Sequence, residues 1–161
     1  MKIRDAAPSE FEEVGAIRVA AYRADGFLSE HSRYEPRLRA LGTDGTGHVL
    51  VAQEDAGGLT GTIMLQEWPD AGQVVTGPDE AEIRALAVLP AARGTGTGRA
   101  LLAAAIDRAR AAKVRHLVLC TQPEMKTAHR LYEAAGFARL PDRDWSPEPG
   151  VDLLAYGLVL G

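Results

Sequence analysis

The stretch Arg93-Gly94-Thr95-Gly96-Thr97-Gly98-Arg99 decides the interpretation of this chain, because it joins an expected strand to an expected helix. The strand covers residues 82–88, and the helix covers residues 97–112, where Leu and Ala recur at helical spacing. Glycines let backbone N–H groups turn towards one point, and the N-terminus of the helix adds partial positive charge. The stretch therefore predicts a phosphate-binding loop, against the plainer interpretation of a strand-to-helix turn.

The kind of phosphate ligand can be narrowed from the spacing of the glycines. A Walker loop would need Gly-Lys-Ser/Thr at its end, which the stretch lacks. A dinucleotide fingerprint has the pattern Gly-x-Gly-x-x-Gly/Ala. Counted from Gly94, its last position falls on Arg99, and counted from Gly96, it falls on Leu101. The next strand ends in Cys120-Thr121-Gln122, with no acid for a ribose hydroxyl. A nucleotide-binding α/β module is kept only as a rival interpretation.

The chain after the loop continues the same alternation of strands and helices. Residues 115–120 read as a buried strand, which makes a strand-helix-strand unit with a right-handed crossover. Residues 125–135 predict a further helix that stops at Gly136, and residues 137–140 and 151–160 predict closing strands.

The first half of the chain is less regular. Residues 2–4 predict a short strand, and Ser9 with Glu12 predicts a capping box that opens a helix ending near residues 25–26. A weaker helix around residues 34–41 is interrupted at Pro36 and stopped by Gly42. Residues 48–53 and 59–67 predict an antiparallel hairpin.

Composition bounds the class of protein. The 161 residues predict one domain covering 1–161. Eighteen Lys plus Arg against 22 Asp plus Glu give a net charge of −4, so we expect no nucleic-acid partner and no anionic membrane surface. With no membrane helix or signal peptide, we expect a cytoplasmic protein. Cys120 has no partner for a disulfide, and the four histidines show no zinc spacing, so we expect no metal.

Two motifs in the right order carry a resemblance to a known family. The pattern R-x-x-G-x-G is met by Arg93, Gly96 and Gly98, directly after the expected strand. Residues 128–137, AHRLYEAAGF, match a second element, A-x-x-L-Y-x-x-x-G-F. With both motifs, the chain strongly resembles the GNAT superfamily of acyl-CoA-dependent N-acyltransferases, firmly over residues 80–140. The resemblance implies an α/β fold with helices on both faces of a mixed central sheet, in the order strand-helix-helix-strand-strand-strand-helix-strand-helix-strand-strand.

The resemblance implies acetyl-CoA as the acyl donor. Its pyrophosphate would rest on the backbone amides of residues 94–98, with two arginines adding charge, and its pantetheine arm would lie along residues 86–88 as an added strand. The N–H of Val88 would polarise the thioester carbonyl. The alternative for these strand residues is an ordinary core strand. The implied donor-binding residues are Leu86, Ala87, Val88, Arg93, Gly94, Thr95, Gly96, Thr97, Gly98 and Arg99.

The resemblance also implies two catalytic residues. Tyr132 would protonate the leaving thiolate, and Glu82 would act through water as the base that deprotonates the amine. Strand alternation would put Glu82, Arg84, Leu86 and Val88 on one face. The plainer alternatives are a half-buried aromatic side chain for Tyr132 and a solvated acid or a partner of Arg84 for Glu82. Glu80 is a weaker candidate for the base. His31 lies in the loop between the first two helices, which in the family frames the substrate pocket, and its plainer alternative is an exposed side chain without a role.

The implied function is transfer of an acetyl group from acetyl-CoA to a primary amine, by direct attack in a ternary complex. The alternative is an acyl-CoA-binding sensor or scaffold. The acceptor would be a small amine or a protein amine, and aromatic and acidic side chains suit a small cationic amine. Relatives often carry an asparagine where this chain has Met125. The apolar residues 153–160 would permit a homodimer. The candidate acceptor residues are Tyr22, Phe27, His31, Tyr34, Trp68, Asp142, Asp144 and Trp145.

Overall fold

The computed structural model of the protein describes residues 1–72 and 74–161. The chain forms two compact units, residues 1–64 with 85–105 and residues 65–84 with 106–161. We call them unit 1 and unit 2 and describe each by itself. The strands are β1 (Lys2–Asp5), β2 (His48–Gln53), β3 (Leu59–Glu67), β4 (Glu80–Val88), β5 (His116–Thr121), β6 (Ala138–Arg139), β7 (Trp145–Glu148) and β8 (Val151–Val159). The α-helices are α1 (Phe11–Ala24), α2 (Glu35–Ala40), α3 (Thr97–Ala111) and α4 (Lys126–Ala134), and short 3₁₀ turns cover η1 (Pro8–Glu10), η2 (Pro90–Ala92) and η3 (Pro141–Arg143).

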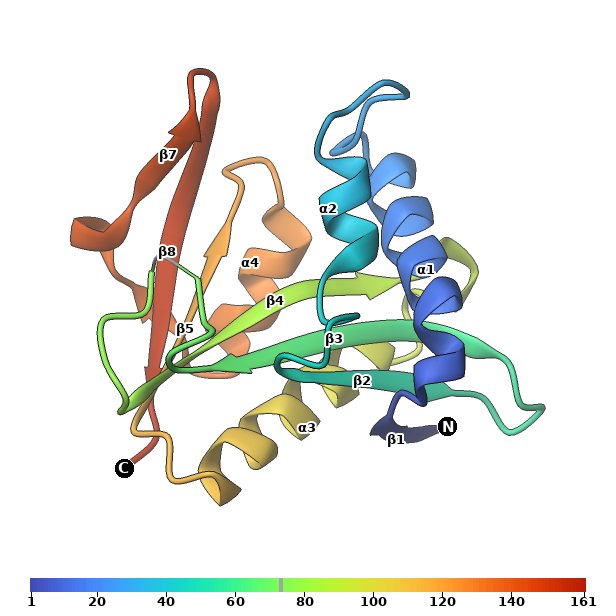
Figure 1. Cartoon of the computed structure of the whole chain (residues 1–161), viewed down its shortest axis with the longest axis horizontal. Coiled ribbons are helices and arrows are strands. Elements are labelled where there is room, and N and C mark those ends of the chain that lie inside the picture. Colours follow the sequence, from blue (N-terminus) through green and yellow to red (C-terminus); the bar gives the residue numbers. More distant parts are fainter. Residues whose placement is uncertain (73) are drawn as a thin grey trace. The chain divides into compact units, whose positions relative to one another are not determined.

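Unit 1 contains strands in the order β1-β2-β3-β4, and β1 pairs with β2 antiparallel from Lys2↔Gln53. The α1 side chains Val14 and Ile17 are buried against Val51 of β2 and Met64 of β3. Figure 1 shows α1 and α2 lying side by side over this part of the sheet. The helix α1 is therefore amphipathic, and its apolar face is buried against the sheet.

A glycine in β3 brings the first turn of α3 close to the opposite face of the same sheet. A Cβ added to Gly61 would lie 2.9 Å from a Leu101 methyl and 3.2 Å from the Thr97 methyl. Gly61 and Met64 lie three residues apart and so point to opposite faces, with α3 on one and α1 on the other. In unit 1 the expected helices on both faces of the sheet are confirmed.

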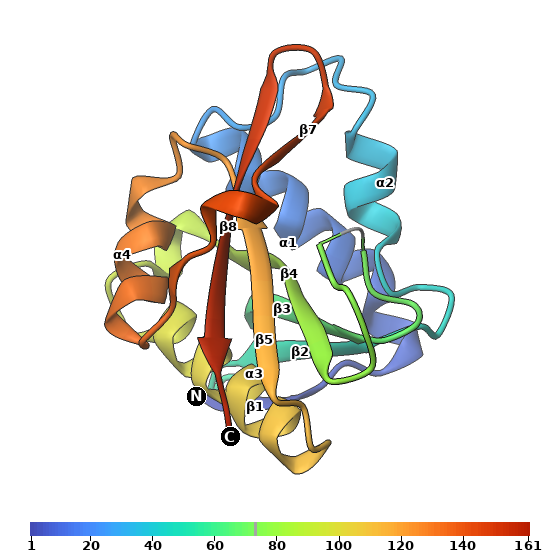
Figure 2. The same cartoon turned by 90° about the vertical axis from the view of Figure 1, so that its left-hand side faces the viewer.

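Unit 2 contains strands in the order β3-β4-β5-β8-β6, with β7 paired to β8. The pair β4–β5 is parallel, and β8 runs antiparallel to β5, β6 and β7. Figure 2 shows β8 running along β5 and turning back into β7. The strand β8 is therefore paired with β5 along one edge and with β6 and β7 along part of the other, and the homodimer stays a prediction.

The mixed α/β class predicted from the sequence is confirmed, with three differences in detail. Ser9 lies in η1 instead of capping α1, and Glu10 accepts a hydrogen bond from the Ala7 N–H instead. Pro36 stands in the first turn of α2, where a missing N–H costs nothing, so it starts the helix and does not interrupt it. The strand β7 lies within residues 141–150, where clustered Gly and Pro favour a loop, and an edge strand tolerates its Pro147.

No helix in the described ranges is long and apolar enough to span a membrane.

Candidate active site

The glycine loop of unit 1 has the backbone that its sequence predicts. Gly94 and Gly96 adopt φ angles of +79° and +85°, in the left-handed region that L side chains rarely enter. A Cβ at either position would meet no protein atom within 4 Å. These glycines are therefore required by backbone conformation, and the space in front of them is open to a ligand.

The amides of residues 94–98 stand at the start of α3 without acceptors. Within residues 1–72 and 74–161, none of these five N–H groups is paired with a backbone or side-chain oxygen. The Thr95 hydroxyl donates to the Ala92 carbonyl and lies 3.0 Å from the Thr97 hydroxyl, which fixes the turn. A row of unpaired amides at a helix N-terminus fits a diphosphate group.

The two arginines that flank the loop differ in their contacts. Arg93 donates to the Asp25 carboxylate, to the Ala21 carbonyl at 3.3 Å and to the Val88 carbonyl at 3.3 Å. It therefore fastens the loop to the end of α1, and this contact accounts for the residue without a ligand. Arg99 is exposed in the first turn of α3. Arg99 is the better placed of the two to add charge to the loop.

The strand β4 carries a backbone irregularity that the sequence does not predict. Ala85 has a φ of +53°, which costs a non-glycine residue roughly 1–2 kcal/mol. The expected alternation of Glu82, Arg84, Leu86 and Val88 on one face is therefore wrong, because the pleat is interrupted between Arg84 and Leu86. Past this point Ala87 is buried in the core of unit 1, whereas Leu86 and Val88 are half-buried.

Glu82 lies in unit 2 on the same face of the sheet as Val118, against which Val74 and Val75 of the segment before β4 pack. Its side chain is only 7% exposed and accepts a 2.8 Å hydrogen bond from the Gly72 N–H. Burial raises the pKa of Glu82, although the charge of Arg84 and the Gly72 hydrogen bond oppose this shift. A buried carboxyl with a raised pKa is closer to the pKa that a general base needs than an exposed glutamate is.

Glu80, the weaker candidate for the base, is instead tied into a structural network. Burial of its carboxyl opposes ionisation, but hydrogen bonds from Arg143, from the Thr76 N–H and from His116 outweigh it and lower the pKa of Glu80 to about 2. Arg143 donates to both carboxylate oxygens, at 2.8 and 2.9 Å. A carboxylate held this firmly cannot accept a proton from an amine near neutral pH.

Tyr132 lies in unit 2 on α4, in a cluster of aromatic rings. Its ring centroid is 5.9 Å from that of Phe137 and 6.3 Å from that of Tyr156. Only 7% of the residue is exposed, and burial raises the pKa of its hydroxyl. The hydroxyl makes no hydrogen bond to any of the described residues. It is therefore a protonated donor without a protein acceptor.

Glu82 and Tyr132 lie on opposite faces of the sheet in unit 2. Glu82 pairs with Val118, whereas Tyr156, against which Tyr132 packs, pairs with the next residue, Leu119. Neighbouring residues of a strand point to opposite faces. The parallel pairing of β4 and β5 ends at Ile83↔Leu119, although β5 continues to Thr121. A ligand between the diverging strands could therefore be reached from one face by the base and from the other by the acid.

Cys120 is the one cysteine of the sequence, and it lies on the same face of the sheet as Glu82. Burial raises the pKa of its thiol to about 11, despite the opposing effect of the Trp145 indole N–H. A thiol with this pKa is almost entirely protonated at neutral pH and is a poor nucleophile. The geometry therefore favours direct transfer over a thioester formed on the protein.

We expect Cys120→Ala to keep kcat within about threefold of the native value, because a protonated thiol contributes packing but no nucleophile. Steady-state rates of thiol release from acetyl-CoA measure this. Intact mass spectrometry after mixing with acetyl-CoA should show no added acetyl group. Loss of turnover together with a stable acetylated native protein would contradict direct transfer.

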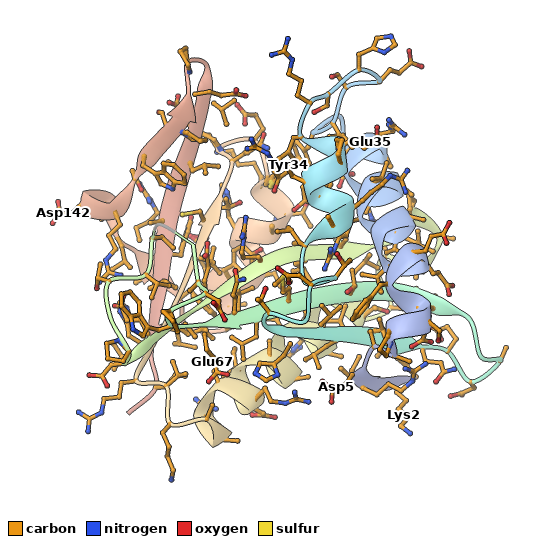
Figure 3. All side chains as sticks on the ribbon, in the orientation of Figure 1. Lys2, Asp5, Tyr34, Glu35, Glu67 and Asp142 are labelled. Atoms are coloured by element: carbon orange, nitrogen blue, oxygen red, sulfur yellow. The ribbon has the colours of Figure 1, made fainter. Side chains whose placement is uncertain are left out.

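Two of the candidate acceptor residues, Asp142 and Asp144, are the acidic ones, and both lie in unit 2. In unit 2, Asp142 points away from the ribbon into solvent (Figure 3). Asp144 is held by Arg139 at 2.7 and 2.6 Å and accepts the Ala155 N–H, so its charge is neutralised. The other members are exposed to different extents, with Tyr34 at 40% and Trp68 at 46%. The acidic part of the expected pocket for a cationic amine is therefore absent from these two positions.

Within the described ranges, no group of three His, Cys, Asp or Glu side chains is arranged to hold a metal ion.

Comparison with known proteins gives the family. The sequence model of the acetyltransferase (GNAT) family matches residues 11–137. The chain therefore belongs to the GNAT acetyltransferase family. It is 41% identical over 93 residues to a mycothiol acetyltransferase from Sanguibacter keddieii, a match that covers 58% of this chain and 29% of the relative. A mycothiol acetyltransferase from Streptomyces bingchenggensis is 36% identical over 96 residues, covering 58% and 28%. The chain thus spans less than a third of the length of these curated relatives.

Solved structures agree over the whole chain. An acetyltransferase of the GNAT family from Staphylococcus aureus superposes with a TM-score of 0.78 at 18% identity and covers 99% of each chain. The protein yncA from Salmonella typhimurium, solved with its cofactor acetyl-CoA, gives a TM-score of 0.71 at 25% identity, covering 100% of this chain and 94% of its own. The first likeness shows the GNAT fold.

Proposed function

We propose that the protein is an N-acetyltransferase that uses acetyl-CoA as donor and a primary amine as acceptor, with direct attack in a ternary complex. The observation that carries the proposal is the row of unpaired amides at residues 94–98, set by two left-handed glycines in open space. Amides arranged this way fit the diphosphate of coenzyme A. Family membership supports the same donor.

The proposed reaction balances as a single acyl transfer. The amine nitrogen forms a bond to the acetyl carbonyl carbon, and the bond from that carbon to sulfur breaks. The proton lost by the ammonium goes through water to Glu82. The proton gained by the sulfur comes from the Tyr132 hydroxyl. The Val88 N–H would stabilise the negative charge that develops on the carbonyl oxygen.

The positions of the two side chains support these roles. A base and an acid on opposite faces of the sheet in unit 2 can serve the incoming amine and the leaving sulfur without exchanging protons with each other. The raised pKa of Glu82 makes it a stronger base than an exposed carboxylate. The raised pKa of Tyr132 keeps its hydroxyl protonated. The direction for Glu82 suits a base, whereas the direction for Tyr132 keeps the proton on the hydroxyl but makes it a weaker acid.

The test of the proposal combines binding and turnover. Calorimetry with acetyl-CoA should show a saturable heat, and a panel of primary amines should release free thiol from acetyl-CoA in amounts equal to the acetylated product. Binding without thiol release for every amine is the result that a sensor or scaffold would give. No binding of acetyl-CoA would contradict both interpretations, and protection by ATP or NAD would favour the nucleotide-binding rival.

We expect Tyr132→Phe to lower kcat about tenfold while the KM for acetyl-CoA changes little. The phenyl ring keeps the packing against Phe137 and Tyr156, so only the proton donor is lost. A thiolate with a parent pKa of about 8.5 is already a fair leaving group, which limits the effect. Phe137→Leu provides a matched control for altered packing in the same cluster. A kcat for Tyr132→Phe equal to the native value would remove Tyr132 from the mechanism.

A further inference from the structure

Arg84 of unit 2 differs from Arg139 and Arg143 in that it is not paired with a carboxylate of the described residues. Arg139 binds both oxygens of Asp144, and Arg143 binds both oxygens of Glu80. The half-buried guanidinium of Arg84 makes only one long hydrogen bond, 3.4 Å to the Gln66 side-chain oxygen. It has no carboxylate within salt-bridge distance among residues 1–72 and 74–161. Its fork of donors is therefore available to an anion from outside the protein.

A second donor lies on the same face of the sheet. The Trp145 indole N–H is buried and meets no oxygen acceptor in the described ranges, and its contact is with the Cys120 sulfur, a weak acceptor whose pKa it lowers. Glu82 pairs with Val118, Cys120 with Ala155 and Trp145 with Leu153, so the three side chains share one face of the sheet in unit 2. The charge of Arg84 acts on the same sulfur. A buried N–H that has only a weak acceptor would gain a stronger hydrogen bond from a ligand oxygen.

The third group, Glu82, sets the orientation of a ligand at this position. Glu82 and Arg84 are two residues apart on β4, so their side chains leave the same face roughly 6.6 Å apart along the strand. Arg84 acts on the Glu82 charge without forming an ion pair with it. An amine beside Glu82 and an anionic group beside Arg84 would then belong to one small molecule.

We infer that the acceptor is a small amine that also carries a carboxylate, such as an amino acid. This inference deepens the proposed function and rests on it. Arg84 binds the carboxylate through two parallel hydrogen bonds, and the Trp145 indole N–H donates a third. The ammonium group then points along β4 towards Glu82, where the bridging water takes its proton. This narrows the acceptor expected from the sequence, a small amine or a protein amine, to a small amine that also carries a carboxylate.

The test uses pairs of acceptors that differ only in the charged group. Each amino acid is compared with its carboxamide and its amino alcohol, for example L-phenylalanine with L-phenylalaninamide and L-phenylalaninol, at saturating acetyl-CoA. Rates are corrected for the fraction of free amine. We expect at least about tenfold higher kcat/KM for the carboxylate, mostly through KM, because a charge-assisted bidentate contact is lost in the neutral compounds.

Three variants at two positions assign this preference to named groups. Arg84→Met should reduce the carboxylate preference to about onefold, and Arg84→Lys should restore part of it, because lysine keeps the charge but not the fork. Trp145→Phe keeps the ring and should reduce the preference about threefold to tenfold. Arg110→Met, on an exposed part of α3, is the matched control and should leave it unchanged. The KM for acetyl-CoA should stay constant throughout.

The outcomes separate this inference from the proposed function. Turnover of amines without a carboxylate preference, or a preference that survives in Arg84→Met, overturns the inference and leaves the acetyltransferase standing. If acetyl-CoA binds but no amine is acetylated, the proposed transfer fails. The subsite is then decided by the melting temperature of the acetyl-CoA complex with L-phenylalanine. A rise that Arg84→Met abolishes supports the subsite, and no rise overturns it.

Discussion

We expect Glu82→Gln to lower kcat at neutral pH about 100-fold or more, while the free energy of unfolding stays equal to that of the native protein or rises. The loss of rate is expected because an amide cannot take a proton from the amine. The side-chain oxygen that accepts the Gly72 N–H remains in glutamine, so the local contact can persist. Rate and stability therefore move in different directions, which a purely structural role for Glu82 would not produce.

The pH dependence fixes the sign of both effects. Folding raises the pKa of Glu82 above its ordinary value of 4.5, so the active, ionised form is lost as the pH falls through the raised value. For stability, a raised pKa favours the folded state at low pH, and this contribution disappears as the pH rises through the folded pKa. At neutral pH, the neutral glutamine avoids the cost of a buried charge. We therefore expect the variant to melt at an equal or higher temperature there.

The measurements are pH profiles of kcat and thermal melts of both proteins. The acid limb of the native profile should lie above pH 4.5 and should be missing from the residual activity of Glu82→Gln. Asp79→Asn, just before β4, is a control for loss of a carboxylate nearby in sequence. A variant that keeps the native profile would show that another group is the base.

We expect Gly96→Val to raise the Kd for acetyl-CoA about 100-fold and to lower the free energy of unfolding by roughly 2 kcal/mol. The φ of +85° at Gly96 is strained for a β-branched residue, so the loop either stays strained or moves its amides out of line. The added side chain also occupies the open space in front of the loop. Both effects act on the amides proposed to hold the diphosphate.

Gly45→Val separates backbone strain from ligand binding. Gly45 has a φ of +86° and also has nothing within 4 Å of an added Cβ, but it lies in the turn before β2. We expect this control to lose a similar amount of stability and to bind acetyl-CoA like the native protein. Calorimetric titration and chemical unfolding measure the two quantities. Equal affinities for the two variants would remove the glycine loop from donor binding.

Local sequence patterns predicted most of this fold. The loop of residues 93–99 and the helices that follow it were predictable because glycine spacing and apolar periodicity are read within one element. The strand β7 was missed because Pro147 opposes strand formation, and only its pairing with β8 makes the segment extended. Ala85 was unpredictable because alanine carries no signal for a left-handed backbone.

The candidate site could be proposed from the sequence as residue types but not as electrostatics. Tyr132 was proposed through its motif and Glu82 through its place at the start of the strand before the loop, but the sequence placed Glu82 among exposed acids and partners of Arg84 as readily as among bases. The Gly72 contact that helps to bury Glu82 comes from a loop ten residues earlier, and no spacing predicts it. The free donors of Arg84 and Trp145 could be recognised only once the neighbouring arginines were seen to be paired.

The fastening of Glu80 separates acid inactivation from acid unfolding. Glu80 ties Thr76 and Arg143 to the sheet, and its pKa of about 2 means that this contribution to stability is present above its ordinary pKa of 4.5 and is lost only as the pH falls towards 2. Glu82 takes up its proton at a higher pH than Glu80 does. Between the pKa of Glu82 and that of Glu80, the protein would be inactive but still folded. A sample taken briefly into mild acid should therefore recover full turnover on neutralisation.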